Sequence, residues 1–457
     1  MSTYEEKIRF LAEHTYGSWR PQKGWKSPLF ITKVDGAYFW DHKGNKYLDF
    51  TSQLICTNLG LTNKAISEAI KKQADEMPYI SPGFVCEAKY QATKALLEVL
   101  PKNLTKIFYS TSGTEGIEAA FKITRQYKAP AYKIISRYRS YHGSTGASIA
   151  ATGDPRRWFA EPVNKVPGVI YAPDPFCYRC PFGLDPDKCS LQCAEYVDYM
   201  IKMEGNVAAV LVEPIVGTNG RIVPPDGYMQ RLREITREND VLLIADEVMS
   251  GWFRAGKWFA VNIWGVEPDI LVTAKGSTAA FAPLGITATT KEIAEHFEEK
   301  FFAHGHTYAA HPLVLAPVPA AIEEYKKLYE SGHIDRVGSY LGKRLRELYD
   351  RHPCVGDVRG VGFFWAVEIV KNRETKKPFN TRKDKAEGKP LMVDKISAEL
   401  MKRGVYLLGW ITHFIVTPPL IITEEDVDFF MDAFDEALKI ADAEVEAPQP
   451  YKGYWST

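Results

Sequence analysis

Short apolar runs alternate with amphipathic helical stretches through the middle of this 457-residue chain. The runs are Lys106–Ser110, Tyr132–Ser136, Val207–Val212, Val241–Ala245 and Ile270–Ala274. Their length and composition are typical of strands that are buried on both faces of a parallel sheet. Helical spacing between runs, as in Tyr228–Asn239, supplies crossover connections. The pattern therefore predicts a right-handed, largely parallel α/β sheet over about residues 106–290.

A different pattern flanks this region. Residues 34–50 alternate between apolar and polar side chains and turn at Asp35-Gly36 and Lys43-Gly44, which predicts a small antiparallel meander. Residues 356–369 are typical of a strand pair, and the charged, proline-flanked stretch 372–390 predicts a surface excursion. A chain of this length is too long for one compact core, so we expect two domains.

Composition and charge narrow the range of partners. The chain has 57 basic and 57 acidic residues, so nothing favours nucleic acid or an anionic membrane as a partner. No apolar run reaches the length of about 18 residues that indicates a membrane span. The first residues, MSTYEEKIRF, lack an apolar signal core, and we therefore expect a cytoplasmic protein.

Four of the seven cysteines lie in one short segment, as Cys177, Cys180, Cys189 and Cys193. The CxxC and CxxxC spacings could hold zinc or an iron–sulfur cluster. The alternative is a loop of reduced thiols, and an odd total without an export signal argues against disulfides. We favour reduced thiols and expect no bound metal.

The candidate chemistry lies where two predicted strands end. Asp246 follows Val241–Ala245, and Lys275 follows Ile270–Ala274. Ligands of open parallel sheets bind at the carboxyl ends of the strands, so an acid and an amine there predict one shared site. A partly buried lysine amine can bond to the aldehyde of pyridoxal phosphate, and a carboxylate keeps the pyridine nitrogen of that cofactor protonated.

Two simpler interpretations compete with this one. A Lys-Gly pair after a strand is usually a solvated turn. An apolar strand followed by Asp-Glu also resembles the magnesium-binding strand of a P-loop nucleotidase. That second interpretation requires the string G-x-x-x-x-G-K-[ST], which does not occur in the sequence.

Several spaced strings agree in order, namely D-E-V at 246–248, D-I-L-V-T-A-K-G at 269–276 and A-P-L-G at 282–285. With them the chain resembles the class III, pyridoxal-phosphate-dependent aminotransferases of fold type I, from about Gly36 to about Ile422. The ω-amine and taurine branch is the most similar. The resemblance implies a large cofactor-binding domain with a mostly parallel seven-stranded sheet over residues 58–330. It also implies a smaller α+β domain built from residues 1–57 and 331–457.

The resemblance also assigns residues to the cofactor. The loop Ser112, Gly113 and Thr114 corresponds to the family's phosphate site, and a helix N-terminus after a strand is suited to an anion, although an ordinary N-cap has the same sequence. In the string Tyr141-His142-Gly143, Tyr141 is expected to stack on the cofactor ring and to be catalytic, with His142 as a neighbour.

Four further positions follow from the same resemblance. Glu213 is expected beside the cofactor, and Val248 against the ring face opposite Tyr141. Met249 is a departure, because many relatives carry glutamine there. Thr307 matches a threonine that binds the cofactor phosphate of the partner subunit, which implies a homodimer or a dimer of dimers.

The implied activity is a ping-pong transamination. The expected donor is an ω-amine, taurine or a β-alanine-like amine, and the expected acceptor is a keto acid, with pyruvate preferred. Many relatives bind a carboxylate through an arginine shortly before the Pro-Pro-Leu string, but residues 407–417 contain no arginine or lysine. We therefore expect Arg156 or Arg157 to bind the carboxylate of the acceptor instead. An aminomutase or decarboxylase with the same cofactor, or a non-catalytic scaffold protein, are the alternatives.

Overall fold

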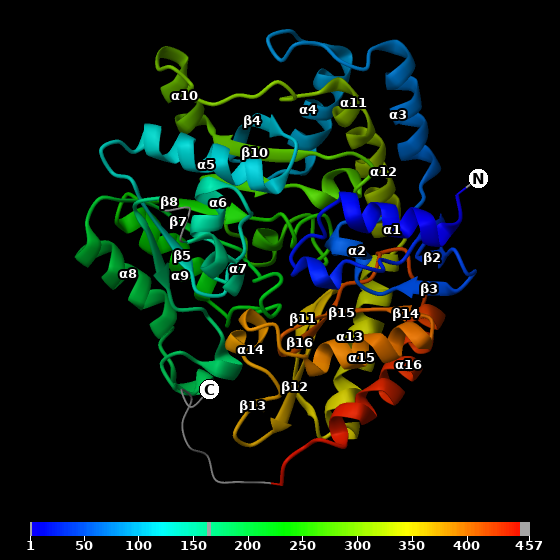
Figure 1. The fold of residues 1–457 in the computed structure, drawn as a ribbon. Helices are drawn as coiled ribbons and strands as arrows, with labels where there is room; N and C mark the ends of the chain where they lie inside the picture. The colour runs from blue at the N-terminus through cyan, green and yellow to red at the C-terminus, as the bar shows by residue number, and fades with distance from the viewer. Residues whose placement is uncertain (1, 162–165, 448–457) are drawn as a thin grey trace.

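The computed structural model describes residues 2–161 and 166–447 (Figure 1). Its central element is a sheet with the strand order β4-β10-β9-β8-β7-β5-β6. The strands are β4 (Leu104–Ser110), β5 (Lys133–Arg137), β6 (Val169–Ala172), β7 (Val207–Val212), β8 (Leu242–Asp246), β9 (Ile270–Thr273) and β10 (Gly285–Thr290). The pairs from β9 through β8, β7 and β5 to β6 are parallel, whereas β10 is antiparallel to both of its neighbours. The prediction of a mostly parallel seven-stranded α/β sheet is confirmed.

Helices cover both faces of this sheet. Leu211 packs in the layer with α5 (Gly113–Tyr127), and its neighbour Val210 packs in the opposite layer with α8 (Gln192–Glu204) and α9 (Tyr228–Glu238). Every residue of β7 and β8 is therefore buried. A strand enclosed on both faces favours a continuous apolar run, which leaves the ends of the strands as the places for charged side chains.

A smaller sheet joins the two ends of the chain. The strands β1 (Ile31–Asp35), β2 (Tyr38–Asp41) and β3 (Lys46–Asp49) form the expected antiparallel meander. Strand β14 (Val405–Tyr406) extends it in parallel to β3. The N-terminal segment therefore packs with the C-terminal part of the chain.

The C-terminal part contains a further sheet with the order β11-β12-β16-β15, to which β13 adds beside β12. The strands are β11 (Val355–Val361), β12 (Phe364–Asn372), β13 (Lys377–Pro378), β15 (Leu408–Trp410) and β16 (His413–Val416). The surrounding helices are α13 (His333–Arg351), α15 (Met392–Lys402) and α16 (Glu424–Asp442). Figure 1 shows them grouped below the large sheet.

The other helices connect these layers. They are α1 (Tyr4–His14), α2 (Ser52–Ile55), α3 (Lys64–Glu76), α4 (Glu87–Val99), α6 (Gly146–Ala151), α7 (Pro155–Ala160), α10 (Lys291–Glu299), α11 (Pro312–Leu315), α12 (Pro317–Glu330) and α14 (Arg382–Ala386). In the described part of the chain, no helix combines the length and apolar composition of a membrane-spanning segment.

Residues 372–390 differ from the surface excursion that their charge predicts. They include β13 and α14, Asn372 is buried, and Arg382 is half-buried. Helix α14 contacts α7 of the large sheet's layer. Two of the charged residues, Arg382 and the exposed Lys383, line a cavity between the two parts of the chain.

Candidate active site

The carboxyl edge of the parallel strands gathers the expected site residues. Lys275 follows β9, Asp246 ends β8, Glu213 follows β7, and Tyr141 and His142 lie in the loop after β5. These four strands are consecutive neighbours in the sheet. Because ligands of such sheets bind outside this edge, strand order explains how residues far apart in sequence meet.

Lys275 stands on a backbone turn that most residues avoid. Its φ is +44°, in the left-handed region that disfavours a residue with a Cβ atom. The turn is held by the Ala280 N–H, which donates to the Lys275 carbonyl at 3.2 Å, and by the Tyr325 hydroxyl, which donates to the Gly276 carbonyl at 2.7 Å. The side chain keeps some accessible surface, yet its amine lies deep enough that burial lowers its pKa. A neutral amine is thereby favoured for attack and proton transfer.

Asp246 is held by two neighbours. Its Oδ2 lies 2.7 Å from Nδ1 of His142, and its Oδ1 accepts from the Val248 N–H at 3.0 Å. The Asp246 side chain is 3% exposed. His142, expected only as a neighbour, thus orients the carboxylate, and no spacing in the sequence indicates this pairing.

The loop before α5 is built for an anion. The Ser112 Oγ accepts from the Glu115 N–H at 3.2 Å, and the Glu115 carboxylate accepts from the Thr111 N–H at 2.7 Å. A Cβ atom on Gly113 would lie 2.7 Å from the Val248 side chain, so only glycine permits this close approach. The amides of Gly113 and Thr114 lie in the first helical turn, where N–H groups have no partner within the helix and favour a negative group.

Glu213 fixes the loop that carries Tyr141. It accepts hydrogen bonds from the Tyr141 N–H at 2.9 Å and from the Gly217 N–H at 2.7 Å. Burial raises its pKa to about 7, opposed by His142 and reinforced by Asp246. Glu213 therefore acts on the position of the Tyr141 ring.

Arg156 lies in front of Tyr141. Its guanidinium carbon is 3.8 Å from the centroid of the Tyr141 ring, 4.7 Å from Trp410 and 5.2 Å from Trp19. The fully buried Asp154 holds it, with 2.8 Å between Arg156 Nε and Asp154 Oδ2. Arg157 turns away toward Tyr171, 4.4 Å from its ring. Of the two arginines that the sequence offers, Arg156 faces the site.

Thr307 lies apart from these contacts. It is exposed, and its carbonyl accepts from the Tyr79 hydroxyl at 3.1 Å. Among the described contacts none joins it to Lys275, Asp246 or Tyr141. An exposed position is what a contact with a second subunit requires, and that role stays a prediction.

Sequence reasoning missed two buried charges near the site. Glu247 is fully buried and accepts from the Val261 N–H at 2.8 Å, and burial raises its pKa to about 7. Its carboxylate also accepts from the Ser250 hydroxyl. Arg221 is also fully buried, with Nε and Nη2 unpaired among the described residues. The adjacent acids at a strand end were the available signal for Glu247; none marked Arg221.

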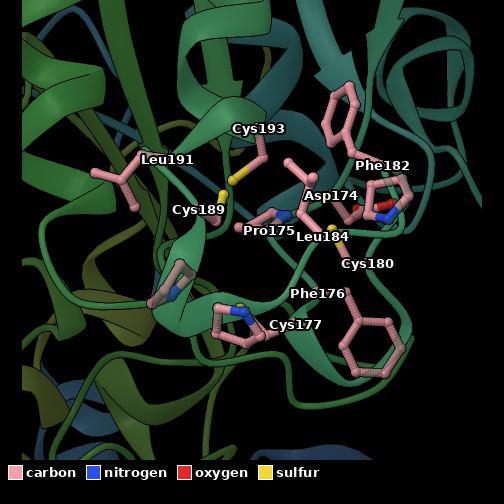
Figure 2. A pocket seen from close by; sticks show the side chains of 13 residues that line it. Asp174, Pro175, Phe176, Cys177, Cys180, Phe182, Leu184, Cys189, Leu191 and Cys193 are labelled. Carbon is pink, nitrogen blue, oxygen red and sulfur yellow. The ribbon is translucent and has the colours of Figure 1, made fainter.

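The four clustered cysteines line a small cavity of about 30 Å³ (Figure 2). Figure 2 shows Cys180 across this cavity from Cys189 and Cys193. Within the described residues, no group of three cysteine, histidine or acidic side chains is placed to hold a metal ion. Burial raises the pKa of Cys193 to about 12, which favours the protonated thiol at neutral pH.

The site residues fit pyridoxal phosphate. The α5 N-terminus suits the phosphate, the buried Asp246 suits the pyridine N–H, and the Lys275 amine suits the aldehyde. The assignment of Tyr141 and Val248 to the two faces of the cofactor ring stays a prediction. The unpaired Nε2 of His142, which is buried, is a further polar atom available at this place.

Comparisons with known proteins agree with this geometry. The sequence profile of the class III aminotransferases matches residues 21–438. The putrescine–pyruvate aminotransferase of Pseudomonas aeruginosa is 34% identical over 417 residues, which cover 88% of this chain and 89% of the relative. An uncharacterized aminotransferase of Bacillus subtilis, YhxA, is 34% identical over 92% of this chain and 94% of its own.

Solved structures give the same result. The taurine:2-oxoglutarate aminotransferase from Bifidobacterium kashiwanohense, in complex with pyridoxal phosphate and glutamate, superposes with a TM-score of 0.92 at 35% identity and covers 97% of this chain and 99% of its own. An (S)-enantioselective ω-transaminase from Thermomicrobium roseum has a TM-score of 0.89 at 29% identity, covering 96% and 98%. The chain therefore belongs to the class III aminotransferases, which depend on pyridoxal phosphate.

Proposed function

We propose that this aminotransferase moves the amino group of an ω-amine, taurine or β-alanine-like donor to a keto acid, with pyruvate as the acceptor, by a ping-pong mechanism. The observation that carries the proposal is the position of Arg156, which lies in front of Tyr141 among three aromatic rings. The names of two relatives support it, since one acts on putrescine and pyruvate and the other on taurine and 2-oxoglutarate.

Arg156 has the free donor that an acidic substrate needs. Its Nε and Nη2 bond to Asp154, whereas its Nη1 makes no hydrogen bond to the described residues. Guanidinium groups bind carboxylates and sulfonates strongly when partly shielded from water, and the rings of Trp19, Tyr141 and Trp410 pack around this one. The acid group of taurine, β-alanine or a keto acid is therefore expected at Nη1.

Each site residue then has one task in the reaction. Lys275 Nζ takes the proton from the amine-bearing carbon of the donor and holds it within the site. When bound, pyridoxal phosphate supplies the ring that accepts the electron pair left on that carbon. Asp246, oriented by His142, holds the proton on the ring nitrogen, and Glu213 keeps the Tyr141 loop in place.

The donor half-reaction tests the role of Arg156 directly. Single-turnover absorbance of the cofactor is followed after adding taurine or 1-phenylethylamine, which lacks an acid group. In Arg156→Gln, the rate constant divided by the half-saturating concentration should fall about 10- to 100-fold for taurine, with little change for 1-phenylethylamine. Arg157→Gln is the matched control. An equal loss for both donors, or no loss for taurine, contradicts the proposal.

A requirement for the acceptor separates the proposal from an aminomutase with the same fold. An aminomutase keeps the amino group on one substrate and turns over without a keto acid. Steady-state turnover of taurine should therefore stop when pyruvate and 2-oxoglutarate are both left out. The ratio of kcat/KM for these two keto acids then identifies the preferred acceptor.

A further inference from the structure

A second cavity, of about 770 Å³, lies at the other end of the same sheet edge. Arg139 lines it from the loop after β5, and Asp174 from the loop after β6. Arg382, the first residue of α14, and Trp410, the last of β15, line it from the C-terminal part of the chain. It therefore lies outside the carboxyl ends of parallel strands, where α/β sheets bind ligands.

Some cations of this cavity are balanced by nearby acids. Arg179 Nε lies 2.8 Å from Glu368 Oε1, and Glu368 Oε2 lies 2.7 Å from Arg359 Nη1. Arg359 Nη1 also lies 2.6 Å from Asp357 Oδ2, so two acids balance the two arginines. Lys383 is exposed and has Glu387 at 3.8 Å. These charges leave no excess that would call for a ligand.

Three other arginines depend chiefly on Asp174, because the further acids near them, Glu368 for Arg139 and Asp154 for Arg382, are paired with other arginines. Asp174 interacts electrostatically with Arg139, Arg137 and Arg382, and none of the three forms an ion pair within the described residues. Arg137 is 2% exposed, and its Nε, Nη1 and Nη2 have no hydrogen-bond partner there. Arg382 donates to the Tyr138 carbonyl at 3.2 Å. The cluster therefore holds two positive charges more than negative ones.

Arg139 is charged at neutral pH. Burial, and then repulsion from Arg382, lowers the pKa of Arg139 to about 10, which is still well above neutral. Burial raises the pKa of Asp174, and its three arginines oppose that shift. Like charges held together away from water are costly unless an opposite charge joins them.

We propose that this cavity binds a small organic dianion through Arg139 and Arg382. Arginine recognises carboxylate and phosphate oxygens with paired N–H groups, and a dianion neutralises the two excess charges. The cavity volume lies in the range of small-molecule sites, about 300–1,000 Å³. Trp158, Phe176 and Trp410 offer aromatic surface to the remainder of the ligand.

A chain of hydrogen-bonded side chains lies between this cavity and Arg156. The Trp410 Nε1–H donates to Asn219 Oδ1 at 3.0 Å, and the Asn219 amide donates to Asp154 Oδ2 at 3.2 Å. Asp154 in turn holds Arg156. The two proposed anion sites share these hydrogen-bonded side chains but use different arginines. Substitution of one arginine at a time can therefore distinguish them.

Titration calorimetry of the cofactor-loaded enzyme tests the proposal with two probes, phenyl phosphate and glutarate. At least one should bind with one site per chain, and Arg382→Gln and Arg139→Gln should each weaken it about tenfold or more. Arg237→Gln, an exposed cation on α9, should leave binding unchanged. Tighter phenyl phosphate indicates a phosphate monoester as the ligand class, and tighter glutarate indicates a dicarboxylate.

Binding must also persist in Arg156→Gln. Loss of binding in Arg156→Gln with retention in Arg382→Gln would place the probe in the active site and overturn the proposal, as would a failure of both probes to bind. If Arg139→Gln unfolds, Arg382→Gln and Arg382→Lys carry the test, because Arg382 lies on the short, half-buried α14. The lysine variant should retain more affinity than the glutamine variant.

Discussion

The two ends of the sheet edge differ in their balance of charges. At the cofactor end, the buried acids Asp246, Glu213 and Glu247 are accompanied by the cations Lys275 and Arg221. At the cavity end, Asp174 interacts with Arg137, Arg139 and Arg382. The carboxylate of Asp246 suits a protonated ring nitrogen, and the surplus of arginines at the other end suits an anion.

Two glutamates show what determines the pKa of a buried acid in this protein. Glu213 and Glu368 are 4% and 1% exposed, so burial alone would raise the pKa of both. Glu213 has a pKa raised to about 7. In Glu368, Arg359 and then Arg179 outweigh burial and lower the pKa to about 2. The facing arginines, and not the depth of burial, determine which form is stable.

The largest expected effect comes from removing the amine at the cofactor end. Lys275→Ala should lower kcat by about 10⁴-fold, because a positioned acid–base group contributes up to that factor. Steady-state assays with taurine and pyruvate measure it. Lys291→Ala, which removes an exposed amine, is the control, and Lys275→Ala turnover near the parental rate would refute the assignment.

A smaller loss is expected at Asp246. Asp246→Asn keeps the size of the side chain but removes the charge that His142 and the Val248 N–H orient. The expected decrease in kcat is about 10²–10³-fold, as for other preorganised electrostatic contacts. Cofactor absorbance should show that the ring is still bound. An unchanged kcat would mean that Asp246 does not face the ring nitrogen.

Glu368→Gln tests the cavity end through stability. It leaves Arg179 and Arg359 without their shared carboxylate, which should lower the free energy of unfolding by about 3 kcal/mol. The lowered pKa of Glu368 means that its stabilisation is present above about pH 4.5 and is lost as the pH falls toward 2. Thermal unfolding of Glu368→Gln and of the exposed Glu374→Gln control is compared at pH 7, 3 and 2. The two proteins should differ most at pH 7, less at pH 3 and least at pH 2.

The smallest effect on stability is expected from Glu247, at the cofactor end. Its contribution to stability changes with pH in the opposite direction to that of Glu368. Its raised pKa, about 7, means that the folded state binds the proton more tightly, so stability falls as the pH rises from about 4.5 to 7. In Glu247→Gln that pH-dependent part should disappear, a change of about 2 kcal/mol across this range. Unfolding curves at several pH values measure it, and parallel pH profiles for the two proteins would contradict the account.

Sequence patterns located the cofactor end because its signals are local. The strands β7, β8 and β9 are short, mainly apolar runs. The charged site residues lie at or just after their ends: Asp246 ends β8, Glu213 follows β7, and Lys275 lies two residues after β9. Burial on both faces forces this composition. The order in which strands pair is not local, so the sequence could not show that His142 meets Asp246.

The cavity end was not predictable for the same reason. Arg137, Arg139 and Arg382 come from β5, the loop after it and α14, and only the tertiary fold brings them to Asp174. The choice between Arg156 and Arg157 likewise depends on which side of α7 faces Tyr141. Adjacent residues of a helix point in different directions, and the sequence does not state which direction is inward.

The most direct test of the cofactor end is the visible spectrum of the purified, cofactor-loaded enzyme during a single cycle of substrates. Addition of taurine or β-alanine without a keto acid should bleach the absorbance of the Lys275-bound cofactor, and pyruvate should then restore it. A band that stays unchanged with every amine of the panel, or a protein that remains colourless after addition of pyridoxal phosphate, would contradict the assignment of Lys275 and the transamination built on it.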